Sequence, residues 1–311
     1  MTEVADTLDR ALGAYLGLAL GDALGATVEF MTPREIKHRF AAQGGVHRHI
    51  VGGGWLKLAP GQVTDDTTMS LALGEALLRG ESLGRPFDTQ LIAEAFLAWW
   101  RGKPVDCGNT CRRGIARYRR DGSLQGEPAE ADGGNGALMR NLPVVLATLN
   151  DDAAFERVSL AQARVTHHHP HSDAAVLGIG RLLRTQLAGA DAATMQRHVD
   201  AWVREHPVFR HDPYPGRASA YVVDTVQTVL HAYTRHAGFE DAVVAAVNRG
   251  EDAVVWARYG AAADGVDAAA TVLGYRALAP KGRFAVLLLA AAAAVTGGLA
   301  AEQLAAANQD V

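Results

Sequence analysis

The stretch Thr64-Asp65-Asp66-Thr67-Thr68-Met69-Ser70 leads directly into the helical run Leu71–Leu78. It predicts a helix N-terminus that carries two adjacent carboxylates between hydroxyl side chains. One Asp at such a position is stabilising, because it caps backbone amides and interacts favourably with the helix dipole. Two acids flanked by Thr64 and Thr67 also form a cluster of hard oxygen donors that suits Mg²⁺ or Mn²⁺. An ordinary N-cap with a second acid is the alternative interpretation.

Helical periodicity recurs along the rest of the chain, whereas alternating strand patterns are scarce. Breakers such as Gly102-Lys103-Pro104 separate the periodic runs. We therefore predict an all-α fold of ten or more helices. No Ser/Pro/Gly-rich linker divides the 311 residues, so we expect a single domain over residues 1–311. The runs are Leu8–Leu16, Leu71–Leu77, Leu91–Trp99, Leu142–Leu149, Ala175–Leu183, Tyr221–Tyr233 and Ala242–Val247.

The net charge of −4 argues against nucleic acid as the main partner. Basic residues nevertheless gather in one stretch, at Arg112, Arg113, Arg117, Arg119 and Arg120. This cluster could meet an acidic protein or a phosphate. A solvated helix face is the alternative.

The sequence predicts a cytoplasmic protein. Cys107 and Cys111 are its only cysteines, so there is neither a disulfide framework nor a zinc quartet. The N-terminus lacks the basic and apolar regions of a signal peptide. The run Phe284–Ala301 carries no charge and reaches the length of a membrane span, but it is rich in Ala and interrupted by Gly297-Gly298. We expect it to be a soluble helix, buried or at an edge.

Three further segments carry features of a ligand site. Gly17–Phe30 is apolar except for Asp22 and Glu29, which are seven apart and would share one helix face. An acid buried there is costly unless it is paired or binds a metal. Gly134-Asn135-Gly136-Ala137 predicts a helix start at which glycines let a ligand approach backbone amides. The His-rich stretch Thr166–Asp173 predicts the start of another helix.

Taken in order, these segments resemble the ADP-ribosylglycohydrolase family, most closely its bacterial branch of dinitrogenase reductase-activating glycohydrolases. The resemblance covers roughly residues 8–252, and eight segments in one order make it specific. They are Gly17–Phe30, Gly52–Trp55, Gly61–Thr67, Pro104–Gly114, Gly134–Gly136, Thr166–Pro170, Ser219–Thr225 and Val247–Gly250. The resemblance implies a compact orthogonal helical bundle with a metal cleft at helix N-termini.

The resemblance also implies a binuclear Mn²⁺ or Mg²⁺ centre. Thr64, Asp65 and Asp66 match one group of metal ligands, and Glu29 matches an acid near the metals. A salt-bridged Glu at a helix end is the alternative for Glu29. Asp252 matches one ligand of the second group.

Hydrolysis of an N-glycosidic bond needs an activated water, a stabilised ribosyl cation and a protonated leaving nitrogen. The resemblance assigns this chemistry to Asp106, Glu29 and Asp66, with Asp106 at the ribose. An N-cap for the following helix is the alternative for Asp106, and a core position is the alternative for Tyr221. The residues expected to hold ADP-ribose are Asn109, Gly134, Asn135, Gly136, His167, His169 and Tyr221. His168 and His171 are expected at the surface.

From Glu251 through to residue 311 the chain departs from the family pattern. Val254 and Val255 stand where the family has Asp and Thr ligands, and neither side chain can bind a hard cation. We therefore expect one metal to bind well, the second to bind weakly and hydrolysis to be slow.

The leading hypothesis is a hydrolase that removes ADP-ribose from a modified arginine of a protein. By resemblance the target is the nitrogenase iron protein, a PII-type nitrogen signalling protein is a second partner, and the enzyme is a monomer. The alternative is a catalytically weak ADP-ribose-binding or regulatory protein on the same scaffold. A structural protein is a third possibility, against which the intact acids Asp65, Asp66 and Asp106 argue.

Overall fold

The computed structural model describes residues 2–250, and within them the fold is all-α, as predicted. Eleven α-helices and three short 3₁₀ turns make up this part of the chain. The α-helices are α1 (Thr2–Gly25), α2 (Pro33–Arg39), α3 (Asp65–Ser82), α4 (Thr89–Arg101), α5 (Asn109–Asp121), α6 (Leu142–Ala147), α7 (Asp152–Arg164), α8 (Pro170–Leu187), α9 (Ala192–Glu205), α10 (Val222–Arg235) and α11 (Phe239–Val247). The 3₁₀ turns are η1 (Ala41–Gln43), η2 (Glu130–Asp132) and η3 (Pro207–Phe209).

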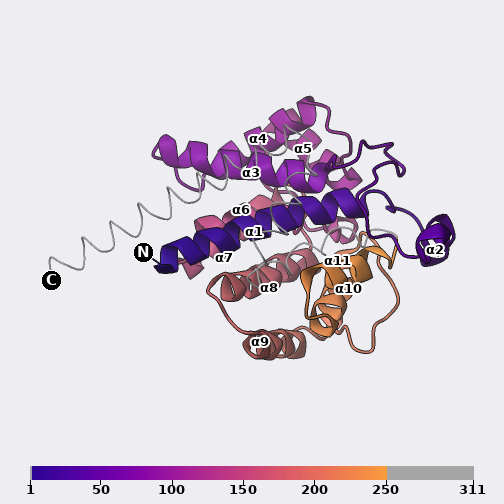
Figure 1. Cartoon of the computed structure of the whole chain (residues 1–311). Coiled ribbons are helices and arrows are strands. Elements are labelled where there is room, and N and C mark those ends of the chain that lie inside the picture. Colours follow the sequence, from indigo (N-terminus) through magenta and orange to yellow (C-terminus); the bar gives the residue numbers. More distant parts are fainter. Residues whose placement is uncertain (1, 251–311) are drawn as a thin grey trace.

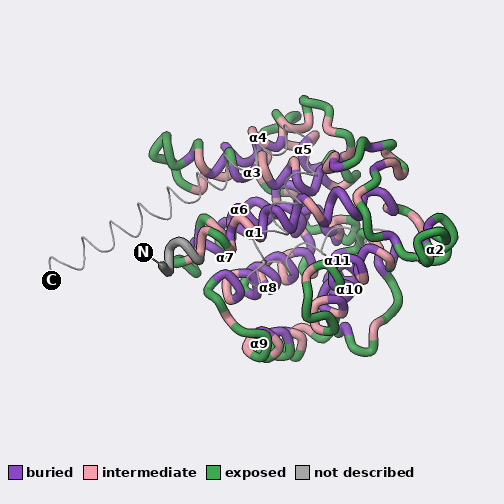
Figure 2. Tube along the Cα trace, viewed as in Figure 1, coloured by how far each residue is buried: buried purple, intermediate pink, exposed green. Residues whose placement is uncertain are grey.

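The helices stack in layers around α1 (Figure 1). Helices α3, α4 and α5 lie on one side of it, and α8, α10 and α11 lie on the other, with α9 outermost. One large apolar core joins the layers and includes Leu18 of α1, Met69 of α3, Phe96 of α4 and Ile179 of α8. Figure 2 shows buried residues running along these inner helices, whereas α2 and the outer turns are exposed.

Several helices begin with a side-chain cap from the residue before them. The carboxylates of Asp88, Asp151 and Asp191 accept hydrogen bonds from first-turn amides of α4, α7 and α9. Helices α3 and α5 differ, because Thr64 and Gly108 precede them and neither supplies a side-chain cap. Both helix starts belong to the candidate site, where side chains of other helices accept hydrogen bonds from their backbone N–H groups.

Two expectations about helix boundaries were wrong. Helix α1 ends at Gly25, so Glu29 lies in the following turn and does not share a helix face with Asp22. Gly134-Asn135-Gly136 opens a series of turns, and the next helix, α6, begins only at Leu142. In both places the candidate residues therefore lie in turns and not in a helix.

None of the described helices is long and apolar enough to cross a membrane. Cys107 and Cys111 are buried free thiols. The segment 251–311, with Asp252, Val254, Val255 and the run Phe284–Ala301, lies outside the described residues.

Candidate functional site

A buried carboxylate of α1 caps the start of α3. Asp22 has no exposed surface, and its Oδ2 accepts hydrogen bonds from the backbone N–H of Thr64 at 3.0 Å and of Thr67 at 3.2 Å. The hydroxyls of the same two threonines donate to Asp22 at 2.8 and 2.6 Å. The cost of burying this acid is therefore offset by hydrogen bonds, and α3 is held against α1 at a defined position.

Asp65 and Asp66 occupy the first turn of α3, and both are buried. Neither acid is the N-cap, which is Thr64, so the N-cap interpretation was wrong. The Thr64 hydroxyl lies 3.1 Å from Asp66 Oδ2. The Asp65 carboxylate accepts a hydrogen bond from the backbone N–H of Gly108, which joins the start of α3 to the start of α5.

Negative charge accumulates at this junction. Burial raises the pKa of Asp65 well above its ordinary value, and the neighbouring carboxylates of Asp66, Asp106 and Asp22 raise it further. The Gly108 N–H acts in the opposite direction but is the smallest contribution. Three buried carboxylates and the half-buried one of Asp106 thus interact here, an arrangement that positive charge would stabilise.

The donor set fits a hard divalent cation in charge and in ligand type, since carboxylate and hydroxyl oxygens are the ligands that Mg²⁺ and Mn²⁺ prefer. Thr64, Asp65 and Asp66 are the described residues that would hold it. Over residues 2–250, however, no three acidic, His or Cys side chains surround one point in the way a complete metal centre requires. Glu29 is half-buried in the turn after α1, and Asp252 lies outside the described residues.

Asp106 precedes α5 without capping it. Its Oδ1 accepts a hydrogen bond from the backbone N–H of Cys107 at 2.7 Å, and the N-cap position belongs to Gly108. The helix-cap interpretation of Asp106 was therefore wrong. The carboxylate is half-buried, and Asn109 is exposed on the first turn of α5.

The glycines of the predicted ADP-ribose segment pack against a histidine ring. A Cβ on Gly136 would lie 2.8 Å from His167 Cε1 and 3.0 Å from Cys111 Sγ. A Cβ on Gly134 would lie 3.2 Å from His167 Nε2. Glycine at these positions lets the His167 ring approach the backbone, a requirement that the sequence alone did not reveal.

Asn135 is buried and tied to the segment before α10. Its backbone N–H donates to Ala220 O at 3.0 Å, and its Nδ2 donates to Thr225 Oγ1 at 3.1 Å. Gly134 forms an isolated antiparallel bridge with Tyr221. These contacts fix the glycine segment beside the N-terminus of α10.

A buried arginine sets the protonation of His167. Arg140 Nη2 donates to Thr166 Oγ1 at 2.8 Å, and burial lowers the pKa of Arg140 only to about 10, so it remains a cation. Thr166 Oγ1 also lies 2.8 Å from His167 Nδ1. Within residues 2–250, Arg140 and His167 are the two side-chain hydrogen-bond partners of the Thr166 hydroxyl. The hydroxyl proton therefore points at Nδ1, and the single proton of neutral His167 resides on Nε2. Burial also lowers the pKa of His167 well below its ordinary value.

Tyr221 and two histidines line the edge of this group. Tyr221 is 39% exposed at the N-cap position of α10, so the core interpretation was wrong. Its hydroxyl lies 2.6 Å from His171 Nδ1. His169 caps α8 by accepting from the His171 N–H, and its Nε2 lies 3.6 Å from Glu130 Oε2. His171, expected only as a surface residue, is therefore the tyrosine's hydrogen-bond partner.

Helix α5 connects the carboxylate group to the glycine–histidine group. The Thr110 hydroxyl donates to Ala131 O at 3.4 Å, and Arg113 forms an ion pair with Asp132 at 2.9 Å. On its buried side, Cys111 Sγ contacts both Arg140 and the Gly136 backbone region. The fold thus brings most of the predicted site residues around one helix.

The sequence profile described as ADP-ribosylglycohydrolase matches residues 3–263. The chain belongs to the ADP-ribosylglycohydrolase family. That match includes both groups of site residues and continues past Asp252. Family membership therefore extends over every candidate residue named above.

Relatives within and near the ADP-ribosylglycohydrolase family support the assignment. An ADP-ribosyl-[dinitrogen reductase] glycohydrolase of Rhodospirillum rubrum is 51% identical over 245 residues, covering 79% of this chain and 81% of the relative. The ADP-ribosylarginine hydrolase Tri1 of Pseudomonas putida (strain GB-1) is 33% identical over 261 residues, covering 79% and 67%. A solved structure titled ADP-ribosylglycohydrolase-related protein complex matches with a TM-score of 0.76 at 31% identity, covering 94% of this chain and 99% of the other.

Proposed function

We propose that this chain hydrolyses the N-glycosidic bond between ADP-ribose and a modified arginine of a protein. The observation that carries the proposal is its 51% identity, over 81% of the relative's length, to a glycohydrolase whose name gives dinitrogen reductase as its substrate. The target proposed here is accordingly the ADP-ribosylated nitrogenase iron protein. Hydrolysis would return the arginine to its unmodified form.

The reaction adds water across one bond. The bond between ribose C1 and the guanidine nitrogen breaks, water oxygen bonds to C1, and a proton goes to the leaving guanidine. We propose that Asp106 moves this proton at the ribose, with Asp66 and Glu29 as the other acids of the reaction. The half-buried Asp106 carboxylate suits that role because its one described hydrogen bond, from Cys107, occupies a single oxygen.

We propose Mn²⁺ or Mg²⁺ as the cofactor, held by Thr64, Asp65 and Asp66, with Glu29 nearby and Asp252 contributing to a weak second site. When bound, the cation supplies the positive charge that stabilises an oxygen becoming negative in the transition state. The accumulated carboxylates around Asp65 support this proposal.

The remaining site residues are proposed to bind ADP-ribose. Gly134, Asn135 and Gly136 present a backbone segment fixed by α10, and Asn109 stands exposed at the start of α5. The exposed Tyr221 ring offers a surface for stacking. His167 and His169 border the same segment, and the His167 Nε2–H is a fixed donor there.

A catalytically weak ADP-ribose-binding protein is the second candidate function. Val254 and Val255, at positions where the family has oxygen ligands, favour it, because an incomplete metal site would slow turnover. A PII-type signalling partner, a monomeric state and a cytoplasmic location also remain proposals.

Substitution of Asp106→Asn tests the proposed catalytic role. We expect turnover of ADP-ribosylated iron protein to fall about 100-fold or more, as for loss of a general acid or base. The melting temperature should stay within a few degrees of the parent, because the amide oxygen can still accept from Cys107. Asp200→Asn on α9 is the matched control and should change neither quantity. Parent turnover in Asp106→Asn would exclude the role assigned to this residue.

A further inference from the structure

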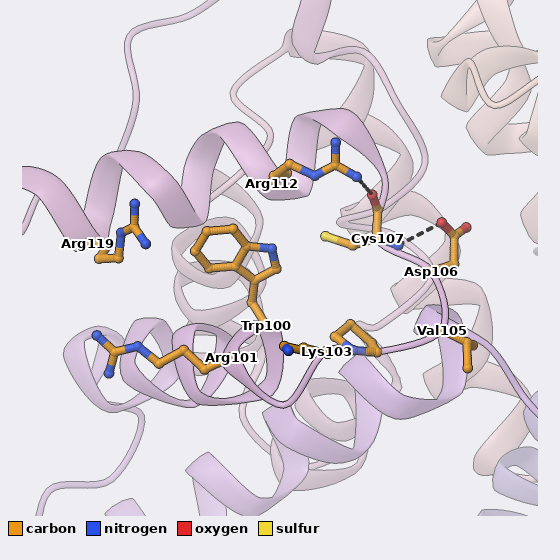
Figure 3. A pocket seen from close by; sticks show the side chains of 9 residues that line it. Trp100, Arg101, Lys103, Val105, Asp106, Cys107, Arg112 and Arg119 are labelled. Carbon is orange, nitrogen blue, oxygen red and sulfur yellow. Dashed lines mark hydrogen bonds between the residues drawn. The ribbon is translucent and has the colours of Figure 1, made fainter.

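A pocket of about 480 Å³ opens beside Asp106, between α5 and the C-terminal end of α4 (Figure 3). It is formed by the C-terminal end of α4, the connection that follows, and one face of α5. Figure 3 shows Trp100, Lys103 and Arg112 around a common opening with Asp106 at one end. The lining residues are Trp100, Arg101, Lys103, Pro104, Val105, Asp106, Cys107, Arg112 and Arg119.

The pocket concentrates positive charge. Arg101, Lys103, Arg112 and Arg119 are all exposed, and within residues 2–250 none of the four forms an ion pair. The guanidinium of Arg119 lies 5.2 Å from the centre of the Trp100 ring. Arg112 donates hydrogen bonds to the Asn109 amide oxygen and the Cys107 carbonyl, both of which are uncharged. Asp106 is the single acid among the lining residues.

The basic stretch of α5 is therefore divided between two faces. Arg113 and Arg120 form ion pairs with Asp132 and Asp121, so a neighbouring acid balances each charge. Arg112 and Arg119, seven residues apart and hence on one helix face, turn toward the pocket instead. Arg113 and Arg120 fit the interpretation of a solvated helix face. Arg112 and Arg119 carry charge that can bind an anion in the pocket.

The position of the pocket indicates which anion it meets. It shares Asp106 with the proposed site, but none of the residues proposed to hold ADP-ribose or metal lines it. If the scissile bond lies at Asp106, the nucleotide extends toward Gly134 and His167. The arginine side chain and its polypeptide must then leave the bond by another route, and the pocket next to Asp106 offers one, because none of the residues proposed to hold the nucleotide lines it.

We propose that this pocket docks carboxylate side chains of the ADP-ribosylated target protein, next to its modified arginine. The inference rests on the proposed function and deepens it, because it gives the enzyme a contact with the protein half of its substrate. Arginine guanidinium groups pair with carboxylates through two parallel hydrogen bonds, and rim charges of this kind mainly accelerate encounter. The volume is sufficient for one or two side chains alongside Trp100.

The double substitution Arg101→Glu with Lys103→Glu tests the proposal. Neither side chain makes a side-chain hydrogen bond or ion pair with the described residues. Arg101 lies in the last turn of α4, where a carboxylate interacts unfavourably with the helix dipole, so the fold should be retained with a small loss of stability. The matched control is Arg197→Glu with Arg204→Glu, a reversal of equal charge at exposed positions of α9. The substrates are ADP-ribosylated iron protein and free ADP-ribosylarginine, each at low and high salt.

We expect kcat/KM for the protein substrate to fall about tenfold or more at low salt through a higher KM, because two attractive charges become repulsive. Turnover of ADP-ribosylarginine should stay within twofold of the parent, and the control should match the parent on both substrates. Unchanged activity on the protein would overturn the proposal. An equal loss on both substrates would also overturn it and assign the pocket to ADP-ribose.

Direct binding separates this proposal from the proposed function. If the parent hydrolyses neither substrate, the proposed function fails, but the affinity for immobilised ADP-ribosylated iron protein can still be compared. Weaker binding by the double variant, with no change in affinity for free ADP-ribose, would support the pocket as a docking surface. Equal affinity of parent and variant for the protein would refute it.

Discussion

Asp22 connects α1 to the candidate site, and its substitution should destabilise the whole protein. Asp22→Asn keeps the size of the side chain but replaces one of two acceptor oxygens with a donor. Asp22 Oδ2 alone accepts from the Thr64 N–H, the Thr67 N–H and the Thr67 hydroxyl at 2.6–3.2 Å. Hydrogen bonds to a charged group contribute about 1.5–3 kcal/mol each but are not additive, so we expect a loss of about 2–3 kcal/mol.

The loss should appear as a fall of about 4–12 °C in melting temperature, at roughly 2–4 °C per kcal/mol for a large domain. Melting is followed by circular dichroism in the presence of a chelator, so that any change in metal binding does not contribute. Asp9→Asn is the control, since Asp9 lies exposed on the same helix. If Asp22→Asn melts within 1 °C of the control, on the order of ordinary surface substitutions, the cross-helix cap does not hold α3 as argued.

Three further outcomes are expected. Asp66→Ala should remove tightly bound Mn²⁺, measured as metal content after desalting, and metal content equal to the parent would exclude Asp66 as a ligand. Val254→Asp with Val255→Thr should raise the Mn²⁺ stoichiometry, whereas two tightly bound ions in the parent would contradict the expected weak second site. Stability should fall as pH drops below about 6.5, because the buried His167 has a lowered pKa and the unfolded chain binds more protons. His167→Gln should make that slope shallower in urea titrations at several pH values, and an unchanged slope would contradict this.

The helical pattern could be predicted because it depends on local spacing. The run Leu71–Leu78 falls inside α3, and the runs Leu91–Trp99 and Tyr221–Tyr233 coincide closely with α4 and α10. The end of α1 was less predictable. The residues after Gly25 remain apolar, and the turn depends on packing with distant segments, since Gly54 lies directly against the Ala26 carbonyl.

The roles of single site residues could be predicted only in part. The sequence implied that Asp22 must be paired, but its partners Thr64 and Thr67 lie more than 40 residues away and no local pattern identifies them. The contact between His171 and Tyr221 likewise joins two helix starts that are distant in sequence. Such pairings follow from how the helices stack, which periodicity does not determine.

The most direct test of the central claim is whether the purified chain releases ADP-ribose from ADP-ribosylated nitrogenase iron protein. Mass spectrometry of both products, with and without added Mn²⁺, measures the released nucleotide and the restored arginine together. We predict stoichiometric ADP-ribose and an unmodified arginine with the parent, and a loss of both with Asp106→Asn. A folded parent that leaves the modified protein intact at every Mn²⁺ concentration would contradict it.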